Sequence, residues 1–300
     1  MSVTVRTLTA PRRPETPRAS VSARRPARAR GWVRYGVMAV IALPWVALPL
    51  WLLTVNSLKT QGDASVPSLS WPSHWGAEAN YRTVIDQGSY LTGLLNSVLT
   101  VIPTIIAVVL FGSMAAWSYA RSRSRGMRFA YYASSVSMIL PPAIIPTVYI
   151  LMQLGINGTR GAYFLTLTGT RLGMVVFLVT GFAKTLPMSL EEAAEVDGAN
   201  RWQIYWHVIL PLLKPALCTS AILLCISVWN DFFFALFLLP GNNQATLPLT
   251  LYRFASTSTT GVAWNLVFAD VVLTNLPILI VYLLLQRRVL SGLTEGAVTG

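Results

Sequence analysis

The sequence predicts an all-α, polytopic membrane protein with six transmembrane helices. The chain is 54% hydrophobic with a mean hydropathy of +0.55, only 11% of its 300 residues are charged, and its apolar residues form long continuous runs. Soluble domains carry about 25% charged residues, so this deficit indicates that lipid surrounds much of the chain. The runs do not alternate with a period of two, which argues against the strands of a membrane barrel.

Six apolar runs are each long enough to cross a bilayer, which takes about 20 residues. In chain order they cover residues 35–55, 94–117, 129–151, 162–183, 212–239 and 262–285. The first is too long for a cleavable signal peptide, and WLLTVNSLK offers no cleavage site, so we expect a retained helix. The stretch PPAIIP (141–146) predicts a kink in the third helix, because proline frees a backbone carbonyl.

Basic residues predict the orientation of these helices. With a cytoplasmic N-terminus, the inside segments hold eighteen Lys and Arg and the outside segments hold four. The positive-inside rule therefore places both termini in the cytoplasm. Nine of the eighteen are arginines that precede the first run. A tail this basic could bind nucleic acid, but topology explains it more simply, and we expect no nucleic-acid partner.

The chain divides into a tail, a membrane domain and a second tail. Residues 1–33 are rich in Pro, Arg and Ala, which predicts a disordered basic cytoplasmic tail. A transmembrane domain is expected over residues 34–290, and residues 291–300 form a cytoplasmic C-terminal tail. Of the two long outside segments, 56–93 contains Trp71, Trp75 and Tyr81, which we interpret as a membrane-interface belt in preference to a docking surface.

The segment 189–211 is a polar, acidic stretch between apolar runs. Four of the eleven acids lie between Glu191 and Asp197. Ser189 with Glu192 predicts a capping box at the start of one helix, and Gly198 predicts its end. Asn200 with Gln203 predicts the start of a second helix, whose expected apolar side is Trp202, Tyr205, Trp206 and Ile209. Spacing alone leaves two readings open: a helix-turn-helix that binds a partner, or a solvated loop with an interfacial helix.

The residues themselves resemble a known motif. Glu192-Ala193-Ala194, Asp197-Gly198-Ala199 and Ile209-Leu210-Pro211 are similar to the EAA motif of binding-protein-dependent ABC importer permeases, which also precedes the penultimate span. Nearly the whole chain after about residue 30 shares the resemblance. Further matches to the carbohydrate, maltose-type branch are Asn56-Ser57-Leu58-Lys59-Thr60, Trp71-Pro72, Asn80-Tyr81, Asn96-Ser97, Trp229-Asn230-Asp231-Phe232 and the tail 285–298. The tail resembles the shorter, six-span subunit of the two unlike permeases.

The resemblance implies a fold, a location and a set of partners. It implies a type I ABC importer permease fold, multi-pass in the bacterial inner membrane, with a cytoplasmic helix-turn-helix coupling element. The implied partners are a second unlike permease, an ABC ATPase dimer, an extracytoplasmic solute-binding protein and membrane lipid. The positions implied to contact the ATPases through the EAA motif are Glu191, Glu192, Ala193, Ala194, Asp197, Gly198, Ala199 and Pro211. A second contact is implied for Leu293, Thr294, Glu295 and Gly296, although a frayed terminus would explain this segment equally well.

Catalytic and cofactor motifs are missing from the sequence. There is no G-x-x-x-x-G-K-[ST] loop, so we expect ATP and Mg to bind the partner subunits and no cofactor to bind this chain. His74 and His207 have no companions at ligand spacing, so we expect no metal. No Ser/His/Asp arrangement indicates a nucleophile, and we expect no enzymatic activity.

Three of the polar residues inside the expected spans need a separate explanation. Arg171, Asp270 and Asn275 are costly in a bilayer, and such residues commonly have functional roles. We hypothesise that Arg171 and Asp270 pair across the fourth and sixth spans or face a water-filled path; the alternative is that each lies nearer an interface. Trp229 could line a sugar path by stacking, although aromatic residues at helical spacing more often pack.

The function expected from these features is half of an ABC importer channel. It would move a carbohydrate or sugar derivative by alternating access driven by partner ATPases. One alternative is a self-sufficient secondary transporter, which would need inverted repeats and midplane ion sites that the sequence does not display. Another is an intramembrane enzyme, which the missing catalytic cluster disfavours.

Overall fold

The computed structural model describes residues 28–256 and 262–297. Within them the regular structure is helical, apart from one antiparallel bridge between Lys59 and Trp75. The chain forms two units, Met1–Leu48 and Pro49–Gly300. The helices are α1 (Arg28–Ser57), α2 (Ala77–Gln87), α3 (Tyr90–Arg121), α4 (Arg125–Val136), α5 (Ile144–Gln153), α6 (Arg160–Ala183), α7 (Ser189–Val196), α8 (Arg201–Ile204), α9 (Leu210–Leu212), α10 (Lys214–Trp229), α11 (Phe233–Leu238), α12 (Leu247–Ser256) and α13 (Trp264–Ala297).

Four helical segments are long and apolar enough to cross a membrane. They are Val40–Ser57, Tyr90–Arg121, Arg160–Ala183 and Trp264–Leu284. A fifth is obtained if Arg201–Leu212 and Lys214–Trp229, which meet at a bend of 74°, count as one span. The expectation of an all-α polytopic protein is therefore confirmed, whereas the described helices give four or five spans by length and composition instead of the expected six.

The third expected span is not one helix. Residues 129–151 divide into α4 and α5, which are separated by the non-helical residues 137–143. Pro141 and Pro142 lie in this gap. Proline lacks a backbone N–H and restricts the residue before it, so two prolines in succession end the helix, where we had expected a kink.

The fifth expected span also ends early. Helix α10 stops at Trp229, and the short α11 begins only at Phe233. The main-chain N–H of Ala235 donates to the Asp231 carboxylate over 3.2 Å, so this side chain satisfies a donor in the first turn of α11. The expected fifth span, residues 212–239, is thus a helix, a break and a second short helix.

The two expected tails differ from the structure at their inner boundaries. Helix α1 begins at Arg28, inside the stretch 1–33 that we expected to be disordered, and residues 1–27 lie outside the described residues. Helix α13 continues to Ala297, so most of the expected 291–300 tail is helical. The disorder predicted for residues 1–27 stays a prediction.

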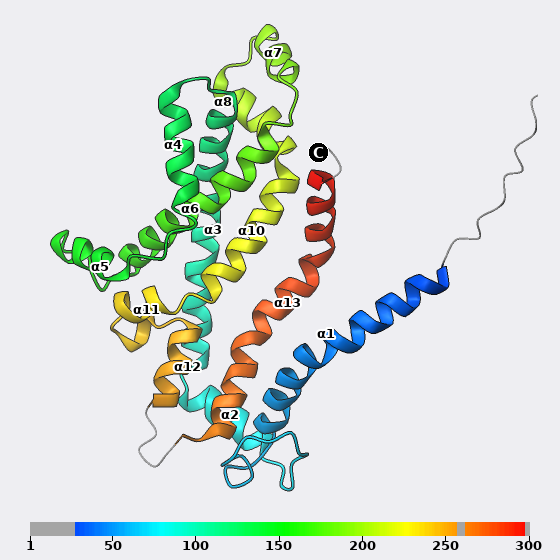
Figure 1. Ribbon diagram of the computed structural model, residues 1–300. Helices are drawn as coiled ribbons and strands as arrows, with labels where there is room; N and C mark the ends of the chain where they lie inside the picture. The colour runs from blue at the N-terminus through cyan, green and yellow to red at the C-terminus, as the bar shows by residue number, and fades with distance from the viewer. Residues whose placement is uncertain (1–27, 257–261, 298–300) are drawn as a thin grey trace, which may run out of the picture. The chain divides into compact units, whose positions relative to one another are not determined.

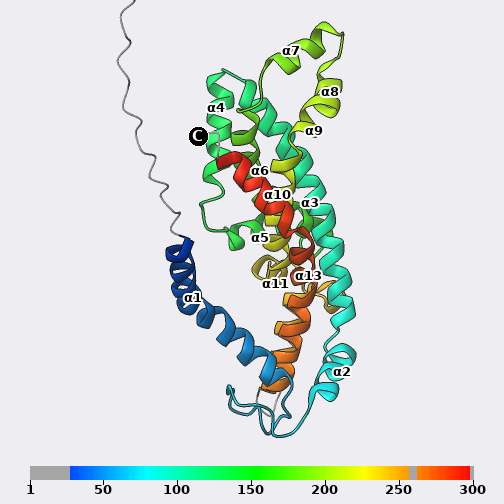
Figure 2. The ribbon, with the colours of Figure 1, turned by 90° about the vertical axis from the view of Figure 1, so that its right-hand side faces the viewer.

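In the unit Pro49–Gly300, α3, α6 and α10 pack side by side along their lengths (Figure 1). Two glycines allow close approach: a Cβ on Gly112 of α3 would lie 2.8 Å from Val175 of α6, and a Cβ on Gly173 of α6 would overlap the main-chain oxygen of Ser134 in α4. Figures 1 and 2 both place α7 and α8 at one end of this bundle and α2 at the other. We call these the α7 end and the α2 end.

The α2 end is held together by buried polar side chains. Lys59 is 1% exposed, and its ammonium group donates to Asn56 Oδ1 over 3.1 Å and to Ser68 Oγ over 2.8 Å. Asn80 donates to the carbonyls of Ser57 and Lys59. Asn56, Lys59 and Asn80 belong to motifs that resemble the carbohydrate branch. In this chain their side chains stabilise the segment between α1 and α2.

Three tryptophans form an exposed cluster beside this segment. The ring centroids of Trp51 and Trp71 are 5.7 Å apart, and those of Trp71 and Trp75 are 5.9 Å apart. All three side chains are exposed, as an interface belt requires. Tyr81 does not join them, because its hydroxyl bonds to the buried Ser57. A belt made of Trp71 and Trp75 stays a prediction.

Candidate functional site

The turn of the 189–211 element is fixed by glycine. Gly198 has φ +83°, the left-handed region that favours glycine. The N–H of Ala199 donates to Ala194 O and that of Gly198 to Glu195 O, both over 3.0 Å, which is the hydrogen-bond pattern of a Schellman motif. No atom lies within 4 Å of a Cβ placed on Gly198. The glycine that ends α7 is therefore confirmed, and its backbone angle is the reason for it.

Only one of the two expected capping boxes forms. Helix α7 follows Met188 and has no side-chain cap, so the box predicted for Ser189 and Glu192 is wrong. Pro187 starts the helical turn earlier, since its carbonyl accepts from Leu190 N, and Ser189 lies inside the helix. The second box is confirmed: Asn200 Oδ1 accepts from Gln203 N over 2.9 Å, and Asn200 N donates to Gln203 Oε1 over 2.7 Å.

Only part of the apolar face expected after the turn is buried. Tyr205 and Ile209 are each 1% exposed, whereas Trp202 and Trp206 are exposed. Residues Tyr205–Ile209 form a π-helical turn, and this wider turn shifts side chains away from α-helical register. The Tyr205 hydroxyl bonds to Ser113 Oγ of α3 over 2.8 Å.

Glu191 is fixed to α3. Its carboxylate accepts from Arg121 Nε over 2.6 Å and from the Trp117 indole N–H over 3.1 Å. Arg121 also donates to the Leu186 carbonyl over 3.0 Å. The Glu191 residue is 9% exposed. A buried ion pair with this geometry holds α7 on the end of α3, and it leaves Glu191 little surface for another subunit.

The other expected contact positions lie mostly on the surface. Glu192, Ala193, Asp197, Gly198 and Pro211 are exposed, while Ala194 and Ala199 are partly buried against the bundle. Val196 at the tip is 88% exposed. A groove of about 570 Å³ runs beside the turn and is lined by Asp197, Gly198, Ala199, Gln203, His207 and Val208. Around the turn, the element thus presents small and acidic residues outward from a fixed base.

Trp117 and Arg121 were not predicted as site residues. In the sequence, Arg121 is one of the basic residues that indicate orientation, and Trp117 is the last residue of an apolar run. Their contacts with Glu191 join positions about 70 residues apart. The spacing of residues in one sequence carries no signal for such a contact.

Arg171 does not pair with Asp270. Its Nη2 lies 3.5 Å from Asp231 Oδ1, and the Tyr163 hydroxyl donates to Asp231 Oδ2 over 3.0 Å. Asp270 instead accepts from Thr274 Oγ1 over 3.2 Å, and its Oδ2 is buried with no hydrogen-bond partner among the described residues. The hypothesised Arg171–Asp270 pair is therefore wrong for this structure, because the break after α10 brings another carboxylate to α6.

Trp229 connects two helices. It is 6% exposed, and its indole N–H donates to the Thr274 carbonyl of α13 over 3.2 Å. Its ring borders a cavity of about 930 Å³ whose other lining residues are apolar or cysteine: Val98, Val101, Ile102, Ile105, Cys218, Ala221, Ile222, Cys225, Ile278 and Val281. A lining without hydroxyl or amide groups does not favour a sugar path, so packing is the better interpretation of Trp229.

Asn275 lies on the surface of α13. It is exposed, and its amide donates to the Val271 carbonyl of its own helix over 2.8 Å. The structure therefore brings Arg171 to Asp231 and Trp229 to α13. Trp229 and Asp270 bond to the same residue of that helix, Thr274, whereas Asn275 lies on its surface. A pathway role for Asn275 or Asp270 stays a prediction.

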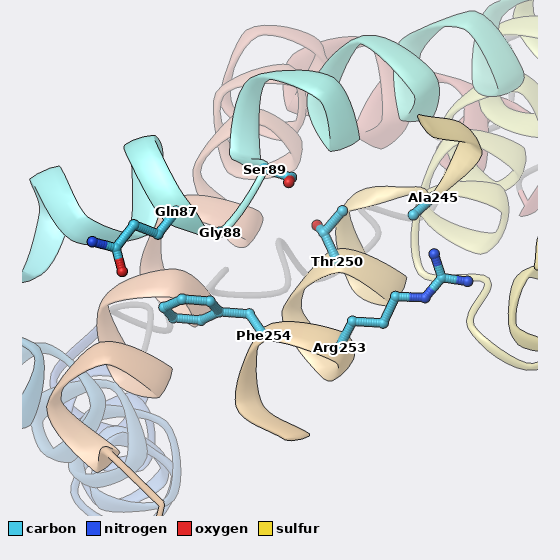
Figure 3. Close-up of a pocket in the computed structure, with 7 residues that line it drawn as sticks. All are labelled: Gln87, Gly88, Ser89, Ala245, Thr250, Arg253 and Phe254. Carbon is cyan, nitrogen blue, oxygen red and sulfur yellow. The ribbon is translucent and has the colours of Figure 1, made fainter. Parts of the chain in front are cut away.

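A second hollow opens at the α2 end. It measures about 440 Å³ and is lined by Gln87, Gly88, Ser89, Ala245, Thr250, Arg253 and Phe254 (Figure 3). Ser89, which precedes α3, has φ 55°, a left-handed angle that is uncommon for a residue other than glycine. Arg253 Nη2 donates to the Leu239 carbonyl over 2.6 Å and so ties α12 to the end of α11.

The expected C-terminal contact lies beyond the described side chains. Leu293, Thr294, Glu295 and Gly296 are within α13, but side chains after Leu284 are outside the described part of the structure. Their contact with an ATPase stays a prediction.

Comparison with known proteins identifies related chains. The profile of the family described as binding-protein-dependent transport system inner membrane component matches residues 108–291. The diacetylchitobiose uptake system permease protein NgcG of Streptomyces coelicolor is 30% identical over 88% of this chain and 85% of its own length. The trehalose transport system permease protein SugB of Mycobacterium tuberculosis is 32% identical over 91% of this chain and 99% of its own.

The fold also matches a solved structure. A chain of a bacterial ABC transporter involved in the import of the acidic polysaccharide alginate superposes with a TM-score of 0.73 at 23% identity, covering 88% of this chain and 97% of that one. The resemblance first drawn from the EAA motif is confirmed by these matches. The chain belongs to the binding-protein-dependent transport system inner membrane components, and with its several apolar helices it is a multi-pass member of that family.

Proposed function

We propose that this chain is a permease subunit of an ABC importer that carries a carbohydrate or sugar derivative across the bacterial inner membrane. The relatives support the substrate class, since their names refer to diacetylchitobiose, starch degradation products and trehalose. The family supports dependence on a solute-binding protein. Transport would proceed by alternating access, with energy from ATP and Mg bound in partner ATPases.

The 189–211 element is the observation that carries the proposal. It ends the bundle in a short helix, a glycine turn and a second helix, and α3 holds both helices through Glu191 and Tyr205. Its exposed side combines the small and acidic residues around the turn with Trp202 and Trp206, and Val196 lies at the tip. A rigid projection of this kind suits a groove on an ABC ATPase dimer, and Glu192, Ala193, Asp197 and Gly198 are the positions we propose for that contact.

The basic residues give the proposed orientation. Arg121 is followed by three further arginines up to Arg128, all near the α7 end, so the positive-inside rule places that end in the cytoplasm. The α2 end then faces outward, where a solute-binding protein would dock. A second, unlike permease would complete the channel. We propose that this chain itself binds no cofactor and catalyses no reaction.

Co-purification from mild detergent tests the proposal. Expressed with its own partners, the tagged chain should retain an ATPase and a second permease. The substitution Ala193→Arg places a long charged side chain on the exposed side of α7 and should remove the ATPase while the second permease stays bound. A matched control, Ala79→Arg, puts the same change on an exposed position of α2 at the opposite end of the bundle. A chain that purifies alone would favour a secondary transporter.

A further inference from the structure

Helix α3 holds both halves of the 189–211 element at its last turns. Arg121 and Trp117 bind the Glu191 carboxylate of α7, over 2.6 Å and 3.1 Å. One turn earlier, Ser113 bonds to the Tyr205 hydroxyl in the segment after the turn. A displacement of the element therefore acts directly on this end of α3.

The other end of α3 holds the segment 243–250 in a comparable way. The Asn96 amide donates to the carbonyls of Asn243 and Ala245, over 2.9 Å and 3.0 Å. Ser97 Oγ accepts from the N–H of Leu247 over 2.9 Å. A Cβ on Gly93 would lie 2.8 Å from Thr250 Oγ1, so the helix backbone packs closely against α12.

Between these ends α3 is a single helix of 32 residues, about 48 Å long at 1.5 Å per residue. Pro103 lies inside it without ending it. Close packing of Gly112 against Val175 of α6 supports the middle. The helix can therefore transmit a shift or tilt from one end to the other.

We infer that α3 connects the two ends of the permease, with Glu191 and Asn96 as positioning residues at its α7 and α2 ends. Closure of ATPases on the 189–211 element then changes the conformation of the segment 243–250, through the Glu191 contacts, α3 and the Asn96 contacts. This inference rests on the proposed function, because it requires ATPases bound to that element.

A labelling experiment tests the connection without knowledge of the transported solute. The native cysteines, Cys218 and Cys225, are both unpaired and are replaced by alanine. The substitution Asn243→Cys then supplies one exposed thiol, and it keeps the Asn96 hydrogen bond, which uses only the main-chain oxygen of residue 243. The rate of labelling by a water-soluble maleimide is measured on the assembled complex, without nucleotide and after trapping with ATP and vanadate.

The expected result is a labelling rate that differs between the two nucleotide states. Glu191→Gln and Asn96→Ala should each abolish that difference while the ATPases remain bound. The charge exchange Glu191→Arg with Arg121→Glu should restore it. Asn230→Ala is the matched control for Asn96→Ala, since among the described residues the Asn230 amide bonds only to a carbonyl of its own helix, and it should leave the difference intact.

Two outcomes would overturn the inference and leave the proposed function standing. One is equal labelling in both states in the otherwise unsubstituted complex. The other is a full nucleotide-dependent difference in both the Glu191→Gln and Asn96→Ala complexes. Loss of the ATPases from the unsubstituted chain would be a different result, because it would contradict the proposed function itself.

Discussion

The Arg171 guanidinium lies 3.5 Å from the Asp231 carboxylate, so an ion pair joins α6 to the break between α10 and α11. The 189–211 element joins the same two helices, α6 and α10, along the chain. They are thus connected by sequence at the α7 end and by opposite charges where α10 ends. The ion pair therefore keeps α6 and α10, the two helices that flank the 189–211 element, at a fixed separation.

The unequal burial of this pair predicts unequal effects. The Asp231 side chain is 6% exposed and that of Arg171 is 26% exposed. Arg171→Met leaves a buried carboxylate without its cation and should cost about 3 kcal/mol, the lower end of the range for breaking a buried pair. Asp231→Asn should cost less, because Arg171 is the less buried of the two and an asparagine oxygen can still accept from it. Thermal unfolding in detergent measures both.

The double variants identify the true partner of Arg171. Arg171→Met with Asp231→Asn should regain part of the lost stability, because no unpaired charge remains. Arg171→Met with Asp270→Asn should show only the sum of its two single effects. Recovery in the Asp270 combination beyond the sum of its two single effects, and none with Asp231, would restore the original pairing hypothesis.

Gly173 provides a test of packing between α4 and α6. A Cβ at this position would overlap Ser134 O of α4, which is backbone and cannot rotate away. Gly173→Ala should therefore destabilise the protein by about 1–3 kcal/mol through overpacking. Gly169→Ala in the same helix meets no atom within 4 Å and should be neutral or stabilising. Equal unfolding temperatures for the two variants would contradict the predicted clash.

Asp270 is expected to tolerate neutralisation. Its Oδ2 atom is buried without a hydrogen-bond partner in the described part of the chain, while Oδ1 accepts from Thr274. Asp270→Asn keeps an acceptor for Thr274 and removes the cost of burying a charge, so the unfolding temperature should stay the same or rise. Solute uptake by the same variant, measured in cells, tests a transport role: stable protein with no uptake would establish one.

Gly198 should be required for its backbone angle. At φ +83° an alanine costs about 1–2 kcal/mol, whereas asparagine tolerates this region better. Gly198→Ala should therefore reduce the ATPase recovered with the chain, and Gly198→Asn should reduce it less. Equal recovery with glycine, alanine and asparagine would show that the turn does not need a left-handed residue.

Local signals in the sequence predicted local structure well. Gly198 and the Asn200–Gln203 box were read from spacing, and both depend on hydrogen bonds between residues a few positions apart. The Ser189 box failed because Pro187 offered an earlier start to the same helix. A favourable N-cap contributes only about 1 kcal/mol to helix stability, so the sequence pattern does not decide between two possible starts within three residues.

Long-range pairs were not predictable in the same way. Arg171 was recognised as unusual, yet its partner was assigned wrongly. The polar pair Asn230-Asp231 interrupts the apolar run 212–239, but the sequence does not show that the Asp231 carboxylate lies against α6. Glu191 was read as a surface contact, but Arg121 and Trp117 bury it. In both cases the deciding contact joins residues at least 60 positions apart, and it depends on how the helices pack.

Pro277 has a consequence for how the last helix can move. Proline offers no N–H to the carbonyl four residues earlier, that of Leu273, which instead accepts from the Tyr90 hydroxyl over 3.1 Å. The neighbouring Thr274 carbonyl accepts from Trp229. Two successive carbonyls are thereby attached to α3 and α10, so α13 cannot rotate about its own axis without breaking both attachments. Any rotation of this final segment must carry the neighbouring helices with it.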